Sequence, residues 1–337
     1  MITIKYILPF LLSFFLNYAL IKYAKKLAIV DIPNERSLHK SIVPRSGGIG
    51  FISAFLLSFL LLEFNLFIEY IYMFLAIATV FSIGFYDDFK RISPKGKFFA
   101  IGISTAFLYF NNIYINSLGS YFGFDVWLFF LAIPFTVFVV SGFTNALNLI
   151  DGLDGLAGGI SIVILATFSY VGFVFNDELI FLLSMFSISV LSAFMMFNWS
   201  PAKIFMGDSG SLSIGFIISV IAILSIKYIH QVIILYFCAI PIIDTIVVML
   251  RRINMKRSPF LADKTHIHHI LYKFFGDTKQ TAIFLILMQL IFCFLGYVVA
   301  RHIEHYPNGL FPIAMIVTFF ILIAMAYMVF TAILKRV

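Results

Sequence analysis

The sequence predicts an all-α polytopic membrane protein with about eleven transmembrane helices, its N-terminus outside and its C-terminus in the cytoplasm. Of the 337 residues, 62% are hydrophobic and only 12% are charged, whereas soluble domains average roughly 45–50% and about a quarter. Apolar runs close to the ~20 residues that a helix needs to cross a bilayer recur along the whole chain. The positions of Lys and Arg then predict the orientation.

The apolar runs give the individual spans. We expect them at 3–21, 48–63, 69–86, 98–110, 126–143, 158–175, 179–197, 211–227, 231–250, 281–300 and 310–332. The first run has no small-residue cleavage site after it, so it is predicted to be a span and not a removed signal peptide. No long polar run separates the spans, and residues 1–337 are therefore expected to form a single integral-membrane domain.

The loops alternate between basic and nearly uncharged. Of the 23 Lys and Arg residues, 20 lie in or beside one set of loops, and only Lys5, Lys227 and Arg301 lie near the other set. The positive-inside rule places the basic set in the cytoplasm. Nucleic acid is excluded as a partner, because these cations are spread over several short loops against a bilayer. The predicted cytoplasmic loops are 22–47, 87–97, 144–157, 198–210 and 251–280.

The stretch 145–159, NALNLIDGLDGLAGG, stands out between two apolar runs. An ionised Asp in hydrocarbon costs about 2.5 kcal/mol or more, so this stretch is not the interior of a span. Its glycines allow close approach of a ligand, and its carboxylates and amides suit Mg²⁺ or a sugar. Asp151 and Asp154 are three residues apart, as are Asn145 and Asn148, so each pair would share a face of a helical turn. We therefore expect the centre of an active site here.

Further acidic residues recur on the same predicted face. Asp87 and Asp88 end a span, where the helix dipole disfavours anions, and Lys95 and Lys97 follow them. Carboxylates next to lysines suit a metal–diphosphate site, although a solvated pair is the simpler alternative. Asp208 lies in Met-Gly-Asp-Ser-Gly-Ser, where small residues let a ligand approach the backbone. A turn residue that binds local amides is the alternative for Asp208.

The basic loops supply candidate partners for phosphate. Lys40 and Arg45 precede the second span, and Arg251 and Arg252 begin the longest loop. His266, His268 and His269 lie near the end of that loop, where they suit contacts with a diphosphate better than zinc, because no Cys is near them. Asp244, inside a span, is either a buried hydrogen-bond anchor or part of the site.

Five of these strings occur together in a known family. PRSGGIGF, FYDDF, NALNLIDGLDGLAGG, FMGDSGSL and SPFLADKTHIHHIL follow one another between residues 44 and 271. In this the chain resembles the polyprenyl-phosphate N-acetylhexosamine-1-phosphate transferase superfamily, and within it the bacterial undecaprenyl-phosphate N-acetylglucosaminyl-1-phosphate transferases. Those enzymes initiate O-antigen, enterobacterial common antigen or teichoic acid linkage units. The muramoyl-pentapeptide branch comes second, because PRSGG and HIHH depart from its TPTMGG string and its triple His.

The resemblance implies a reaction and a set of roles. A sugar 1-phosphate would pass from a UDP-N-acetylhexosamine to undecaprenyl phosphate, with Mg²⁺ (or Mn²⁺) as cofactor, and UMP would leave. Asp208 and Asn148 would bind the metal, and Asp87 and Asp88 would act as nucleophile, general base or phosphate-handling groups. The remaining residues are implied as contacts to substrate: Lys97 (or Lys95) and the three histidines to phosphate or sugar, Asp151 and Asp154 to the nucleotide, and loop 251–280 to the choice of sugar.

Physical chemistry favours direct attack by the lipid phosphate over an aspartyl-phosphate intermediate. A phosphate monoester has its second pKa near ~6, so it is already a dianionic nucleophile at neutral pH. A cytosolic UDP-sugar and a bilayer-bound lipid meet only at the cytoplasmic face of the bacterial inner membrane. A secondary transporter is the alternative from another class, but no internal repeat is visible. The sequence leaves open which sugar is used and whether the chain forms a homodimer.

Overall fold

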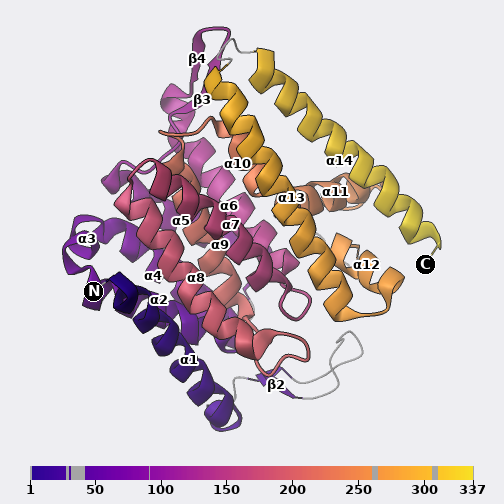
Figure 1. Cartoon of the computed structure of the whole chain (residues 1–337). Coiled ribbons are helices and arrows are strands. Elements are labelled where there is room, and N and C mark those ends of the chain that lie inside the picture. Colours follow the sequence, from indigo (N-terminus) through magenta and orange to yellow (C-terminus); the bar gives the residue numbers. More distant parts are fainter. Residues whose placement is uncertain are drawn as a thin grey trace.

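The computed structural model of the chain describes residues 2–27, 30–31, 42–90, 92–259, 265–305 and 310–336, and it is almost entirely helical (Figure 1). The helices are α1 (Ile2–Leu27), α2 (Gly47–Leu62), α3 (Phe64–Glu69), α4 (Ile71–Phe89), α5 (Pro94–Leu108), α6 (Ala132–Ile150), α7 (Leu156–Val174), α8 (Glu178–Asn198), α9 (Gly207–Ser225), α10 (Gln231–Phe237), α11 (Ala239–Asn254), α12 (Ile267–Phe275), α13 (Thr278–His305) and α14 (Leu310–Arg336).

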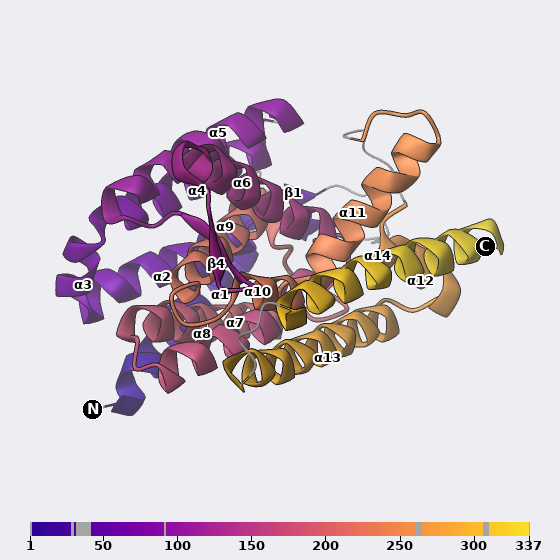
Figure 2. The same cartoon turned by 90° about the horizontal axis from the view of Figure 1, so that it is seen from above.

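Helix α9 is the centre of the bundle (Figure 2). It packs against α2, α4, α6, α7 and α8, and nearly all of its side chains are buried. Small residues allow this close packing, as at many helix interfaces in membranes. A Cβ on Gly48 of α2 would lie 2.1 Å from the Gly210 amide nitrogen, and one on Gly84 of α4 would lie 2.4 Å from the Asp208 carbonyl oxygen. The polar N-terminus of α9 is thereby held against the ends of its neighbours.

Each of the eleven apolar segments expected from the sequence contains a helix, but these helices differ in length. Eight helices within the described ranges are long and apolar enough to cross a membrane, and α10 with α11 would make a ninth span if counted together. Helices α2 and α5 are shorter, at 16 and 15 residues. The span expected over 231–250 is not one continuous helix, because the chain bends by 84° between α10 and α11. The count of eleven and the orientation remain predictions.

Two small antiparallel sheets lie at opposite ends of the molecule (Figure 1). Strand β1 (Val30–Asp31) pairs with β2 (Val43–Pro44) near the N-terminus of α9. At the other end, β3 (Ser117–Tyr121) and β4 (Phe124–Trp127) form a hairpin between the expected spans 98–110 and 126–143, and its second strand includes the first two residues of the latter span. Gln231 fixes this hairpin to the start of α10, since its Nε2 donates to the Ser117 carbonyl at 3.2 Å.

Candidate active site

Asp88 joins the end of α4 to the start of α9. Its carboxylate accepts hydrogen bonds from the backbone amides of Asp208 (2.8 Å) and Ser209 (3.0 Å). These two amides are among the N-terminal groups that a helix cannot bond internally, and the positive end of the helix dipole favours an anion there. The sequence pointed to the unfavourable dipole of Asp88's own helix, whereas the structure supplies a favourable one from α9. Two aspartates far apart in the chain are thus brought together.

Asp208 is the hub of the cluster. Its Oδ1 accepts from Arg45 at 2.7 Å and from the Asn148 side chain at 3.2 Å, and its Oδ2 is bound by Lys97. The same Lys97 ammonium lies 2.6 Å from Asp87 Oδ2. The Asp208 carboxylate on α9 therefore binds side chains from α5, α6 and the segment before α2: two cationic groups and one amide.

Arg45 also ties the segment before α2 to this cluster. Its Nε lies 3.3 Å from Asp88 Oδ1. The backbone of the same segment runs beside the loop that precedes α9, with the Phe205 amide donating to the Pro44 carbonyl at 2.7 Å. Two of the expected motifs, PRSGG and FMGDSGSL, thus lie side by side.

The central stretch differs in part from the expectation of a loop. Helix α6 continues to Ile150, so Asn145 and Asn148 are helical, and Asn148 is turned toward Asp208. Asp151 follows the helix in a turn, and Asp154 Oδ2 accepts from the Ala202 amide at 3.0 Å. The expected helical face shared by Asp151 and Asp154 is therefore wrong. Asp154 joins this turn to the loop before α9.

Asp151 is partly buried beside the cluster. Burial raises the pKa of its carboxyl to about 7; Arg45 opposes this rise, and the carboxylates of Asp208 and Asp88 add to it. The proton on Asp151 is therefore exchanged close to neutral pH. An ordinary surface aspartate would be ionised throughout that range.

Asn198 at the end of α8 is a site-forming residue that the sequence analysis did not single out. Its Oδ1 accepts from the Gly155 amide at 3.0 Å, and its Nδ2 donates to the Ile204 carbonyl at 2.8 Å. It joins the turn after α6 to the loop before α9. The only signal in the sequence is an amide at the point where an apolar run becomes polar.

The histidines reach the same region from the other side. A Cβ on Gly152 would lie 2.3 Å from His268 Nε2, so this imidazole rests against the turn that carries Asp151. His268 is 2% exposed, and burial, together with the neighbouring His269, lowers its pKa to about 3, so its ring stays neutral. His266 Nδ1 instead lies 2.7 Å from Asp244 Oδ2. Of the two alternatives for Asp244, the structure shows the hydrogen-bond anchor.

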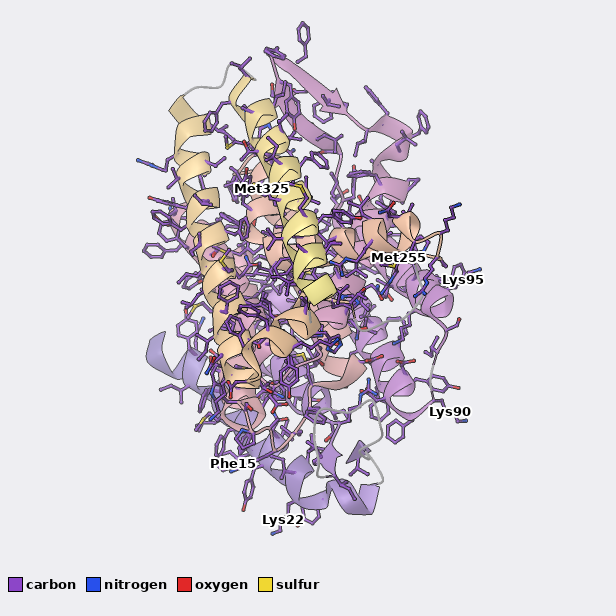
Figure 3. The ribbon with its side chains drawn as sticks, turned by 90° about the vertical axis from the view of Figure 1, so that its right-hand side faces the viewer. Phe15, Lys22, Lys90, Lys95, Met255 and Met325 are labelled. Carbon is purple, nitrogen blue, oxygen red and sulfur yellow. The ribbon has the colours of Figure 1, made fainter. Side chains whose placement is uncertain are left out.

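The remaining basic candidates have different surroundings. Arg251 donates to the Thr265 carbonyl and Arg252 to the Pro259 carbonyl, both at 2.6 Å, so both side chains bind backbone carbonyls within their own loop. Lys95 is exposed and projects from the periphery of the bundle, as does Lys90 (Figure 3). Lys40 lies outside the described residues.

The donor atoms of the cluster suit a hard cation. Within the described ranges, no group of three His, Cys, Asp or Glu side chains is arranged around one point as a metal site would need. Mg²⁺ does not require such a group, because it usually takes one or two protein ligands together with water and substrate phosphate. Asp208 supplies a carboxylate, and the Asn148 amide beside it would supply its oxygen if the amide were turned over. These two residues therefore fit Mg²⁺.

Comparison with known proteins agrees with this geometry. The family model described as glycosyl transferase family 4 matches residues 70–226, which include Asp87, Asp88, Asn148 and Asp208. A probable undecaprenyl-phosphate N-acetylglucosaminyl 1-phosphate transferase of Bacillus subtilis (strain 168) is 34% identical over 304 residues, which cover 86% of this chain and 83% of the relative. The chain belongs to glycosyl transferase family 4. The expected superfamily is thereby confirmed, and the transporter alternative loses its support.

Other relatives agree over most of their length. An undecaprenyl-phosphate alpha-N-acetylglucosaminyl 1-phosphate transferase of Escherichia coli (strain K12) is 31% identical over 319 residues, covering 89% of this chain and 84% of the relative. Its counterpart in Yersinia pestis is 30% identical over 306 residues, covering 87% and 82%. Both matches are longer than the family match over residues 70–226. Because each covers at least 87% of the chain, each also includes the histidines at 266–269.

Proposed function

We propose that this family member transfers an N-acetylhexosamine 1-phosphate, with GlcNAc as the sugar, from its UDP derivative to undecaprenyl phosphate. The products are undecaprenyl-diphosphate-HexNAc and UMP, and the lipid-linked sugar starts a cell-surface glycan such as an O-antigen. The observation that carries the proposal is the convergence of Asp88, Lys97, Asn148 and Arg45 on Asp208. The printed names of the relatives support GlcNAc and the undecaprenyl acceptor.

The charge balance of this reaction matches the cluster. An oxygen of the lipid phosphate forms a bond to the β-phosphorus, and the bond from that phosphorus to the bridging oxygen breaks, so the bridging oxygen leaves with UMP. Two phosphate groups with several negative charges must approach each other, and no net proton is gained or lost. Neutralisation and positioning therefore carry most of the catalysis. Arg45 and Lys97 supply positive charge at the required place.

The residues around Asp208 divide this work. Asp208 and Asn148 would hold Mg²⁺, with Mn²⁺ as the alternative, and the cation would neutralise phosphate oxygens when bound. Lys97, held between Asp87 and Asp208, and Arg45 would turn from carboxylate to phosphate oxygens. Asp88 keeps the N-terminus of α9 in place through two backbone amides.

The surrounding residues would hold the rest of the donor. Asn145, Asp151 and Asp154 lie on or after the end of α6, where they would contact the nucleotide. His266, His268 and His269 would contact the diphosphate or sugar. The loop 251–280, in which Arg251 and Arg252 bind backbone carbonyls, would select the sugar.

The hydrogen bonds of the carboxylates support direct attack by the lipid phosphate. Both oxygens of Asp88 accept backbone amides, and Asp87 accepts from the Ile92 amide and from Lys97. A carboxylate whose oxygens are all engaged by donors is a poor nucleophile. Under an aspartyl-phosphate mechanism, the enzyme would exchange labelled UMP into UDP-GlcNAc without any lipid; we expect no such exchange.

The location follows from the two substrates. The UDP-sugar is polar and cytosolic, and the C55 lipid stays in the bilayer. A site at the ends of α4, α6 and α9 is at the boundary between the two phases if those ends face the cytoplasm, as the distribution of Lys and Arg predicts. We therefore place the active site on the cytoplasmic side of the bacterial inner membrane.

Release of UMP by the purified protein tests the proposal. With undecaprenyl phosphate and Mg²⁺, UDP-GlcNAc should release UMP, and EDTA should abolish the release. UDP-GalNAc tests the choice of sugar, and UDP-MurNAc-pentapeptide tests the muramoyl branch. Asp208→Asn should lower kcat by about 100-fold or more, because one carboxylate near the transferred phosphoryl group is lost. Lipid-dependent turnover of UDP-MurNAc-pentapeptide in preference to UDP-GlcNAc would overturn the proposed substrate.

A further inference from the structure

Asp244 makes two hydrogen bonds at the start of α12. It lies within α11, its side chain is almost completely buried, and its Oδ2 is 2.7 Å from His266 Nδ1. Its Oδ1 accepts from the Ile267 backbone amide at 2.6 Å. One carboxylate therefore fixes both the histidine before α12 and the first amide of that helix.

This contact determines which nitrogen of His266 carries a proton. A carboxylate accepts hydrogen bonds and does not donate them, so Nδ1 must bear the hydrogen that faces Asp244. Nε2 is then the nitrogen through which His266 can meet a substrate, and the ring cannot rotate without losing the bond. The partner of one imidazole nitrogen commonly sets the orientation and tautomer of a functional histidine in this way.

The imidazoles link this pair to the candidate active site. The rings of His266 and His268 are stacked with centroids 5.7 Å apart, and His268 rests against Gly152 in the turn that carries Asp151. A shift of the His266 ring would therefore displace His268 and the turn that it contacts. The contacts run from Asp244 to His266, from His266 to His268, and from His268 to the turn. Asp244 would therefore act through His266.

We propose that Asp244 is a positioning residue for the transfer reaction, which holds His266 in the tautomer and orientation that present Nε2 to the sugar diphosphate. The inference rests on the proposed function. It assigns a positioning role to a carboxylate in α11, outside the Asp208 cluster. Among the described residues, Asp244 has no hydrogen bond to Asp208 or Asp88.

Asp244→Asn is the informative substitution because it changes the hydrogen-bond pattern and keeps the shape. The amide oxygen still accepts from the Ile267 backbone, but the NH₂ group now faces His266 Nδ1. The histidine must then accept at Nδ1 and carry its proton on Nε2. We expect kcat to fall about 10- to 100-fold, by analogy with the loss that follows removal of the hydrogen-bond partner of a metal-binding histidine. The midpoint of thermal unfolding should change little.

Thr245→Val is the matched control. Thr245 is the next residue on α11, and its hydroxyl is buried with no hydrogen-bond partner in the described residues. The substitution has the same size and removes no bond, so kcat and the unfolding midpoint should stay close to those of the wild type. If Thr245→Val lowers kcat as much as Asp244→Asn does, the loss reflects a general sensitivity of α11 to substitution. That result would overturn the positioning role of Asp244.

A double-mutant cycle separates positioning from support of the helix. Asp244→Asn is combined with His266→Ala, and kcat is measured for the wild type, both single variants and the double variant. If Asp244 acts through His266, the double variant has the kcat of His266→Ala. If the two reductions multiply, Asp244 acts independently of His266 and the proposal is wrong.

The same experiment distinguishes the two levels of inference. If the wild type releases no UMP from any UDP-sugar, the proposed function fails, and the positioning role of Asp244 fails with it. If the wild type is active and Asp244→Asn has wild-type kcat, only the role of Asp244 is overturned. The KM for the UDP-sugar is measured as well. If Asp244→Asn raises KM and leaves kcat unchanged, Asp244 contributes to binding of the substrate and not to positioning for transfer.

Discussion

At the scale of single residues, Lys97 and Lys95 provide a direct comparison. Lys97 bridges Asp87 and Asp208, whereas Lys95, two residues earlier on the same helix, is exposed. Lys97→Ala removes the cation that would meet the phosphate and leaves two carboxylates close together without their bridge. We expect kcat for UMP release to fall about 100-fold or more. Lys95→Ala should stay within about twofold in the same assay, and equal losses in the two variants would show that Lys97 has no special role.

Asp151 gives a prediction about pH. Its pKa is about 7 in the folded chain against the ordinary value of 3.8, so the folded state binds this proton more tightly than the unfolded state does. Its contribution to stability is therefore complete below pH 3.8 and is lost as pH rises to 7. Asn carries no charge at any pH. In EDTA, the midpoint of thermal unfolding of Asp151→Asn should exceed that of the wild type by a few degrees at pH 8, and by less at pH 5.

A second variant controls for the loss of any one carboxylate. Asp125 lies exposed on β4, at the end of the molecule opposite β2. Asp125→Asn should shift the unfolding midpoint equally at the two pH values. If the difference between Asp151→Asn and the wild type does not grow from pH 5 to pH 8, the Asp151 carboxyl is not held protonated by its surroundings.

At the scale of helices, the contact between α2 and α9 depends on two glycines. Ala at Gly48 would place its Cβ 2.1 Å from the Gly210 amide nitrogen and 2.4 Å from the Gly210 Cα. These are backbone atoms, which cannot rotate away as a side chain can. Moving the helices apart should cost about 1–3 kcal/mol or more and displace Asp208 from Arg45. Gly142→Ala within α6 is the control: its Cβ would meet nothing within 4 Å, so about 0.5–1 kcal/mol of stabilisation is expected. Thermal unfolding and UMP release together check both variants.

The helices also show how much of the site the sequence could predict. Polar motifs such as Asp87-Asp88 and Gly207-Asp208 contrast strongly with their apolar surroundings, so their gathering on one face could be predicted from loop alternation alone. The partners of Asp88 could not, because they are backbone amides about 120 residues away and an amide has no signature in a sequence.

The continuation of α6 through Asn148 was missed for a related reason. The polar composition of the stretch favours a loop, but the bonds from Asn148 to Asp208 and Ser211 satisfy its side chain within the bundle. Tertiary contacts thus override the local preference of Asn. The bend between α10 and α11 is likewise invisible in an apolar run whose hydropathy is continuous.

At the scale of the whole molecule, the prediction concerns orientation. The β3–β4 hairpin lies at the opposite end of the bundle from β2 (Figure 1), and Pro44 of β2 is bound by the loop that leads into Asp208. An enzyme that uses a cytosolic UDP-sugar at Asp208 must therefore present the hairpin outside. Single cysteines can be placed in a background with Cys238→Ala and Cys293→Ala, since both native cysteines are buried. A membrane-impermeant maleimide should label Asp125→Cys in intact cells and Lys95→Cys only after the inner membrane is permeabilised. The reverse pattern would place the catalytic cluster on the side of the membrane that UDP-sugars do not reach, and the proposed reaction would then lose its donor.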